Sequence, residues 1–249
     1  MLINIIQNTI GTIRNFVESF ASTKSIAFDG TDDYMQIGNV LNLGSTTDFS
    51  ISFWVKVSEA TNNTFLGKRQ NNSNNWKIFS DSSDKIKFEA TDAGTVRFSI
   101  VYSGSALAEG SWNHVVVSCD RSDGSTGLNL YVNKIASTSA AASEADIDNT
   151  GDLRVGAFGS NVTLDGTLMD EVAIYNAALS SADVDKLYNL GKPTDLSLSA
   201  SYDTDRTSNL LSWWRMGDGV GDNSSTIVDQ AGSNNGTLIN SPTIVTDAP

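Results

Sequence analysis

Residues 111–134 read SWNHVVVSCDRSDGSTGLNLYVNK, which is the pattern of two β-strands joined by a polar turn. The residues on either side of the turn alternate or run apolar, as strands of a sheet do. The Asp, Ser and Gly residues between them favour a tight reversal of the chain. This stretch therefore predicts an antiparallel hairpin, and it is the segment that most directly indicates the fold.

The same pattern recurs from Ser25 to the C-terminus. About a dozen short apolar or alternating segments are separated by clusters of Asn, Asp, Ser and Gly. This spacing predicts an all-β sandwich or barrel. One later segment, residues 180–193, predicts a helix that Ser180 or Ser181 caps and that Gly191 and Pro193 end.

Composition excludes several function classes. The formal net charge is −13, from 16 Lys+Arg against 29 Asp+Glu, so we expect binding neither to nucleic acid nor to an anionic membrane surface. The single cysteine, Cys119, excludes an intrachain disulfide framework and lies in an apolar run, where a buried inert thiol is expected. We also expect no signal peptide and no membrane insertion.

The N-terminal 22 residues differ from the rest of the chain. Their apolar side chains repeat at alternating steps of three and four: Ile3, Ile6, Ile10, Ile13, Val17 and Phe20. A heptad pattern with Ile at both core positions favours three or four strands of coiled coil. We therefore predict an amphipathic helix over 1–22 that forms a homotrimer or docks the chain to other proteins. The alternative is a helix that packs on its own domain.

Three stretches together resemble the LamG-like, or concanavalin A-like, jelly-roll family. They are the hairpin above, SIAFDGTDDYMQIGN at 25–39 and LDGTLMDEVAIYNAALSSADVDKLY at 164–188. The resemblance implies a two-sheet antiparallel jelly-roll sandwich over residues 23–249. It implies little about function, because this fold carries lectins, hydrolases, adhesion modules and virion proteins.

The C-terminal segments LLSWWRMGDGVGD, 210–222, and DQAGSNNGTLIN, 229–240, are similar to elements that precede the first strand in many family members. Their position here resembles a circular permutation in which the C-terminus supplies the closing strands. Strand alternation and the family pattern predict Trp214 in the core and Trp213 on the opposite face, near Arg215.

Catalytic residues are not evident in the sequence. Glycosidases of this fold use paired carboxylates on one strand, and the segment most similar to that arrangement, Glu144–Asp148, lacks the final glutamate and follows a loop-like stretch. His114 is the only histidine, which excludes multi-His metal sites, and we expect a hydrogen-bonded strand histidine. We therefore predict a protein that is not an enzyme.

Two ligand sites are candidates. The resemblance implies a structural Ca²⁺ at Asp29 and Asp170, the alternative being that both satisfy turn amides; no cofactor is required. Asn71, Asn74 and Trp76 form a candidate rim for binding glycans, the alternative being packing at the core or sheet edge. Trp54 is expected either under a second layer or in solvent.

The leading functional hypothesis is a non-enzymatic protein of a phage virion surface, either a fibre or a capsid decoration. Its partners would be further copies of the chain or other virion proteins, with a cell-surface glycan as a further candidate. The alternative is a carbohydrate-binding adhesion lectin, and a concanavalin A-like glycosidase is the third reading. The virion assignment rests on the resemblance together with the helical N-terminus.

The trimer is tested by mass. At micromolar concentration we expect light scattering to give three times the chain mass of 26.6 kDa. A monomer at that concentration would contradict self-association through residues 3–20.

Overall fold

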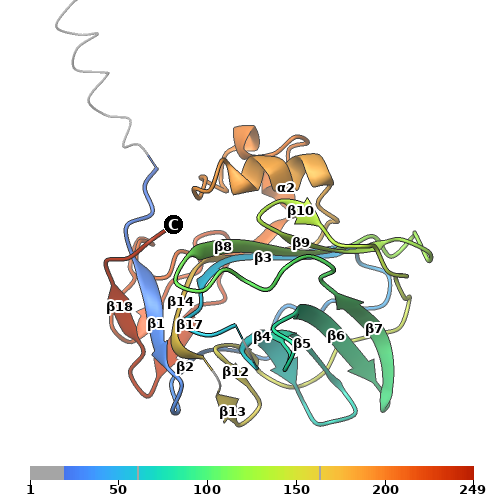
Figure 1. Cartoon of the computed structure of the whole chain (residues 1–249), viewed down its shortest axis with the longest axis horizontal. Coiled ribbons are helices and arrows are strands. Elements are labelled where there is room, and N and C mark those ends of the chain that lie inside the picture. The colour runs from blue at the N-terminus through green and yellow to red at the C-terminus, as the bar shows by residue number, and fades with distance from the viewer. Residues whose placement is uncertain (1–19, 61, 163) are drawn as a thin grey trace, which may run out of the picture.

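The computed structural model describes residues 20–60, 62–162 and 164–249, which form two packed antiparallel sheets (Figure 1). Sheet A has the order β10-β9-β8-β3-β14-β1-β18, with β15 also paired to β14, and sheet B has the order β16-β17-β2-β11-β4-β5-β6-β7. The predicted two-sheet antiparallel sandwich is therefore confirmed.

The strands of sheet A are β1 (Ser25–Asp29), β3 (Phe49–Lys56), β8 (Trp112–Cys119), β9 (Leu128–Val132), β10 (Ile135–Ala136), β14 (Asp165–Tyr175), β15 (Leu210–Trp214) and β18 (Thr243–Val245). Those of sheet B are β2 (Tyr34–Gly38), β4 (Thr64–Arg69), β5 (Asn75–Ser80), β6 (Ile86–Asp92), β7 (Thr95–Val101), β11 (Leu153–Val155), β16 (Thr226–Ile227) and β17 (Gly236–Ile239). A separate hairpin consists of β12 (Ala157–Phe158) and β13 (Asn161–Val162).

Sheet A is buried on both of its faces. Its inner face packs on sheet B, while Val116, Tyr131, Tyr175 and Trp213 on its outer face pack under helix α2 (Ser181–Tyr188) and the chain that follows it (Figure 1). That following chain contains two short 3₁₀ helices, η1 (Ser199–Ser201) and η2 (Thr207–Asn209). Two-sided burial explains why the opening stretch contains a continuous run of valines instead of a strict alternation.

Helix α2 starts where the sequence predicts and ends earlier. Ser180 is its N-cap and forms a reciprocal capping box with Asp183, and Asn189 ends the helix in a left-handed conformation. The sequence predicts that Gly191 ends this helix and that Leu190 belongs to its apolar face. The helix instead ends at Tyr188, and Leu190 is 89% exposed. No helix in the described part of the chain is long and apolar enough to cross a bilayer.

The C-terminal strands close both sheets. β15 pairs with β14 and β18 with β1 in sheet A, while β17 pairs with β2 in sheet B. Trp214 is fully buried in the main core, and Trp213 lies on the opposite face with its ring 5.4 Å from the Arg215 guanidinium. The predicted placement of both tryptophans is confirmed.

The described part of the N-terminal region, residues 20–24, is not helical. Phe20 stacks on Trp213 with 6.1 Å between ring centroids, so it packs on its own domain. The predicted helix therefore does not extend to residue 22, and self-association through the heptad residues stays a prediction. Ile3, Ile6, Ile10, Ile13 and Val17 lie outside the described residues.

Asp229 holds the closing segment together. Its buried carboxylate accepts hydrogen bonds from the Ser212 hydroxyl at 2.7 Å and from four backbone N–H groups: those of Trp213, Ala231, Gly232 and Asn234. An acceptor of this kind fixes the turn between β16 and β17 against β15, because each donor left unsatisfied on burial is costly.

Asp229→Ala removes this acceptor and leaves several donors unsatisfied. We expect the free energy of unfolding to fall by about 3 kcal/mol, measured by urea denaturation. The control is Asp205→Ala, which removes an exposed carboxylate that bonds only Thr207. Equal stability of the two variants would contradict the role of Asp229.

Candidate functional site

The outer face of sheet B is open to solvent, unlike that of sheet A. Among the described residues, only the β12–β13 hairpin reaches over it (Figure 1). Strand register places seven outward-facing residues in one row across the sheet: Thr237, Gln36, Arg154, Gly67, Lys77, Glu89 and Ser99. This row is polar except at its centre, where Gly67 has no side chain.

Gly67 allows the hairpin to approach the sheet. A Cβ atom at this position would lie 2.9 Å from the ring of Phe158 and 3.0 Å from the Trp76 carbonyl oxygen. Glycine at this position therefore leaves room for the Phe158 ring to approach β4. The result is a half-buried aromatic ring held on the open face of sheet B.

Two cations flank this ring. The Arg69 guanidinium lies 5.4 Å from the Phe158 centroid, and the Lys77 ammonium lies 5.2 Å from it and 3.9 Å from the Phe79 centroid. Such distances are those of cation–π contacts. We call Arg69, Lys77, Phe79 and Phe158 the cation–aromatic cluster.

Neither cation of this cluster forms an ion pair with a carboxylate in the described part of the chain. Among the described residues, no ion pair involves Arg69 or Lys77. Arg69 donates one hydrogen bond to the Asn72 side chain, and its Nε is buried without a partner. Burial lowers the pKa of Lys77, the charge of Glu89 raises it, and the charges of Arg69 and Lys87 lower it. The cluster thus contains two positive charges that form no ion pair with a described residue.

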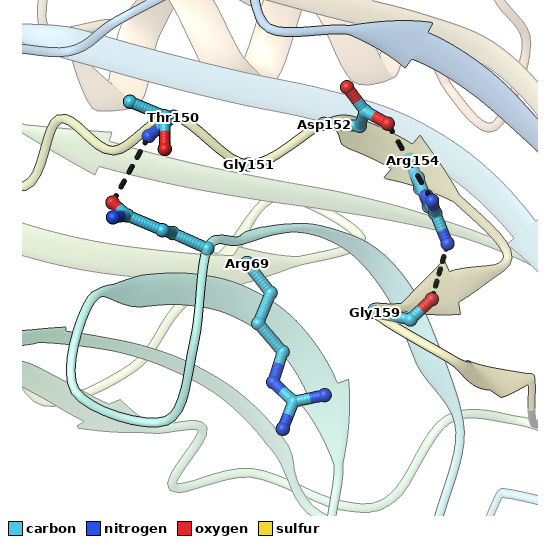
Figure 2. Close-up of a pocket in the computed structure, with 7 residues that line it drawn as sticks. Arg69, Thr150, Gly151, Asp152, Arg154 and Gly159 are labelled. Carbon is cyan, nitrogen blue, oxygen red and sulfur yellow. Dashed lines mark hydrogen bonds and ion pairs between the residues drawn. The ribbon is translucent and has the colours of Figure 1, made fainter.

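A pocket of about 240 Å³ adjoins the cluster (Figure 2). It is lined by Arg69, Gln70, Thr150, Gly151, Asp152, Arg154 and Gly159. Figure 2 shows Arg154 bonded on one side to Asp152, 3.6 Å away, and on the other to the Gly159 carbonyl oxygen. The Arg154 guanidinium also lies 4.7 Å from the Tyr34 ring centroid.

Two glycines shape this pocket. A Cβ atom at Gly151 would lie 2.2 Å from the backbone of Arg69, and one at Gly159 would lie 2.5 Å from Arg69 Nη1. Both glycines therefore let their loops close on Arg69. The pocket offers guanidinium, amide, hydroxyl and carboxylate groups, which suits a polar ligand with many hydroxyls.

The predicted glycan rim is partly wrong. Trp76 is 1% exposed in the main core, because it shares the inward face of β5 with Ile78. The side-chain oxygen of Asn71 accepts hydrogen bonds from the backbone N–H groups of Ser73 and Asn74. The side-chain oxygen of Asn74 accepts one from the backbone N–H of Ala93. Both oxygens therefore stabilise turns. The β4–β5 loop does border the pocket, but through Arg69 and Gln70.

The predicted calcium pair does not converge. Asp29 lies beside Asp165, while Asp170 lies across from Trp54, near the start of β1. Four residues of β1 separate the two positions, about 13 Å along the strand. Asp29 accepts from the Thr31 N–H at 2.8 Å, as the turn alternative predicts. The described residues contain no cluster of three or more His, Cys, Asp or Glu residues suited to a metal.

The single histidine is buried and structural. His114 Nε2 lies 2.9 Å from the Ser52 hydroxyl, its ring stacks on Trp54, and burial lowers its pKa to about 3. Trp54 also stacks on Tyr188, so it lies under the second layer. Cys119 is likewise buried, and desolvation raises its thiol pKa to about 12. All three side chains are therefore buried within the fold.

Two adjacent buried carboxylates anchor the N-terminal segment on sheet A. A β-bulge in β14, with Glu171 at φ 48°, places Asp170 and Glu171 near this segment. Asp170 accepts from the Ser22 hydroxyl at 2.6 Å, and Glu171 accepts from Trp213 Nε1 at 2.5 Å and Arg215 Nε at 3.2 Å. Burial raises the pKa of Asp170 and raises that of Glu171 to about 7.

Comparisons with known proteins agree with this architecture. Residues 29–185 match a family model described as the concanavalin A-like lectin/glucanases superfamily. Botulinum neurotoxin type X of Clostridium botulinum is 26% identical over 180 residues, which cover 67% of this chain but 13% of the neurotoxin.

Two solved structures illustrate the shared fold. A Bacteroides ovatus protein assigned to carbohydrate binding superposes with a TM-score of 0.62 at 18% identity, over 92% of this chain and 62% of that one. Domain 4 of a Geobacillus stearothermophilus arabinanase, in complex with arabinotriose, superposes with a TM-score of 0.52 at 16% identity, over 66% of this chain and 75% of that one.

The raised pKa of Glu171 predicts a pH dependence of stability. The folded protein holds the Glu171 proton more tightly than the unfolded chain, so this group stabilises fully below about pH 4.5 and loses its contribution as pH rises through about 7. We expect Glu171→Gln to gain stability relative to wild type between pH 5 and 7.5, measured by urea denaturation. Parallel profiles of the two proteins over this range would contradict the prediction.

Proposed function

Because the chain belongs to the concanavalin A-like lectin/glucanase superfamily, we propose that it is a non-enzymatic carbohydrate-binding domain. We place the sugar site on the outer face of sheet B, at the cation–aromatic cluster and the adjoining pocket. One observation carries the proposal: the Phe158 ring lies at the centre of the polar outer face of sheet B, because Gly67 has no side chain to exclude it.

The chemistry of this face suits a sugar. A sugar ring has apolar C–H faces that pack on aromatic rings, and Phe158 and Phe79 offer two such surfaces side by side, since Lys77 contacts both. Hydroxyl groups need fixed donors and acceptors, which Gln36, Glu89 and the pocket side chains supply.

The same face argues against glycoside hydrolysis. Hydrolysis needs two carboxylates that flank the scissile bond. The row across sheet B contains one carboxylate, Glu89, and the pocket contains another, Asp152, which is paired with Arg154. The segment Glu144–Asp148 has no strand structure, and its Asp148 accepts from the Gly44 N–H. The binding role described for the relatives supports a lectin-like function for this chain as well.

The wider setting of the domain stays a prediction. We propose that it is displayed outside the cell on the surface of a phage particle, with further copies of the chain or other virion proteins as partners. The heptad pattern in residues 3–17 supports an N-terminal docking or trimerisation element. This proposal is independent of the sugar site, which lies on the other sheet from Phe20.

The sugar site is tested at Phe158. We expect Phe158→Ala to weaken binding to the best ligand of a glycan array about tenfold, because it removes the aromatic surface under the sugar ring. The matched control is Val96→Ala, which removes an exposed apolar side chain from the edge strand β7 of the same sheet. Unchanged affinity of the Phe158 variant, with its fold intact by circular dichroism, would contradict the location.

A further inference from the structure

Positive charge gathers on the outer face of sheet B although the protein is strongly acidic. The net charge is −13, yet Arg69, Lys77, Lys87 and Arg154 come from four neighbouring strands of this sheet. Lys87 pairs with Asp81 at 2.5 Å and Arg154 pairs with Asp152. Arg69 and Lys77 are the two cations of this group that have no acidic partner among the described residues.

Arg121, an arginine with a structural role, differs from Arg69 in its hydrogen bonding. Arg121 is buried, and its guanidinium donates to five backbone carbonyl oxygens, those of Leu43, Gly44, Thr47, Ser143 and Ala145. Lys68, also buried, is bound by the Val40 carbonyl oxygen and by Asn42. These side chains have their hydrogen-bonding capacity met within the fold, as buried polar groups require.

Arg69 is held in place but not satisfied. Gly151 and Gly159 close on its backbone and side chain, and Phe158 covers one side of its guanidinium. It nevertheless donates a single hydrogen bond within the described residues, to Asn72. Figure 2 shows the guanidinium extending away from Asp152, the carboxylate of the pocket. A rigidly positioned cation with free N–H groups is an arrangement for binding an anion.

Lys77 completes the arrangement from the next strand. Its ammonium and the Arg69 guanidinium both lie near the Phe158 ring, at 5.2 and 5.4 Å from the centroid. Glu89 faces Lys77 across the β5–β6 pair and raises its pKa without forming an ion pair. The positive charge of both groups therefore converges on the aromatic surface where the sugar ring is placed.

We infer that the ligand of this site is an anionic glycan, whose carboxylate or sulfate group binds Arg69 and Lys77 while its sugar ring packs on Phe158 and Phe79. The inference rests on the proposed carbohydrate-binding function and narrows its ligand class. Arg69 and Lys77 are then the residues that select acidic over neutral sugars.

The test uses the full-length chain and isothermal calorimetry with three probes: oligogalacturonate, a sulfated dextran oligomer and the neutral oligosaccharide arabinotriose. We expect at least one acidic probe to bind more tightly than the neutral one, with an affinity that falls as NaCl rises. Arg69→Gln and Lys77→Gln should each weaken that binding about tenfold or more, since each removes a charge-assisted contact.

Matched variants separate charge from structure. Arg69→Lys keeps the charge and should retain more affinity than Arg69→Gln. Arg97→Gln, which removes a cation that pairs with Asp92 on the edge of the same sheet, should leave affinity unchanged. Thermal unfolding identifies any variant that loses affinity because it misfolds. If Arg69→Gln misfolds, the affinity of Lys77→Gln decides the test.

The outcomes distinguish the two levels of the proposal. Equal binding of acidic and neutral probes, unaffected by Arg69→Gln and Lys77→Gln but weakened by Phe158→Ala, would overturn the anionic ligand and leave the sugar site standing. No binding of any glycan would overturn both. Preference for oligogalacturonate supports the inference with a carboxylate as the anion, and preference for sulfated dextran supports it with a sulfate.

Discussion

Burial of sheet A on both faces is the constraint from which the rest of the organisation follows. Helix α2 and the chain after it cover the outer face of sheet A, so Val116 and Trp213 are as inaccessible as the residues of the main core. Sheet B is left with the exposed outer face (Figure 1). A function that needs a large polar surface on the sheets must therefore use sheet B, where the hairpin brings Phe158 over Gly67.

Strand β14 connects this buried layer to both ends of the described chain. It pairs with β3 along one edge and with β1 and β15 along the other, so strands from near each end meet on it. The bulge at Glu171 lets one carboxylate bind the indole of Trp213 and the guanidinium of Arg215. Because Arg215 also donates to the Ala21 carbonyl oxygen, this group attaches the N-terminal segment to the closing strand.

Alternation along single strands predicted the fold better than it predicted the site. It placed Trp213 and Trp214 on opposite faces correctly because each is constrained by its immediate neighbours. The same rule applied to β5 puts Trp76 with Ile78 on the core side and Lys77 with Phe79 outside, so the error at Trp76 was avoidable from sequence. Gly67 and Phe158 carry no such signal, since their contact depends on how a separate hairpin folds over β4.

The sequence alone determined the all-β sandwich, the capped helix at Ser180, the inert cysteine and histidine, and the closing role of the C-terminal strands. Each of these follows from local periodicity, capping chemistry or composition. Tertiary structure decided which sheet face stays open, that Asp29 and Asp170 lie apart, and that Arg69 and Lys77 meet at one aromatic ring. The register between β1 and β14, which are distant in the chain, separates Asp29 from Asp170, and the fold of the β12–β13 hairpin over β4 brings Phe158 to Arg69 and Lys77.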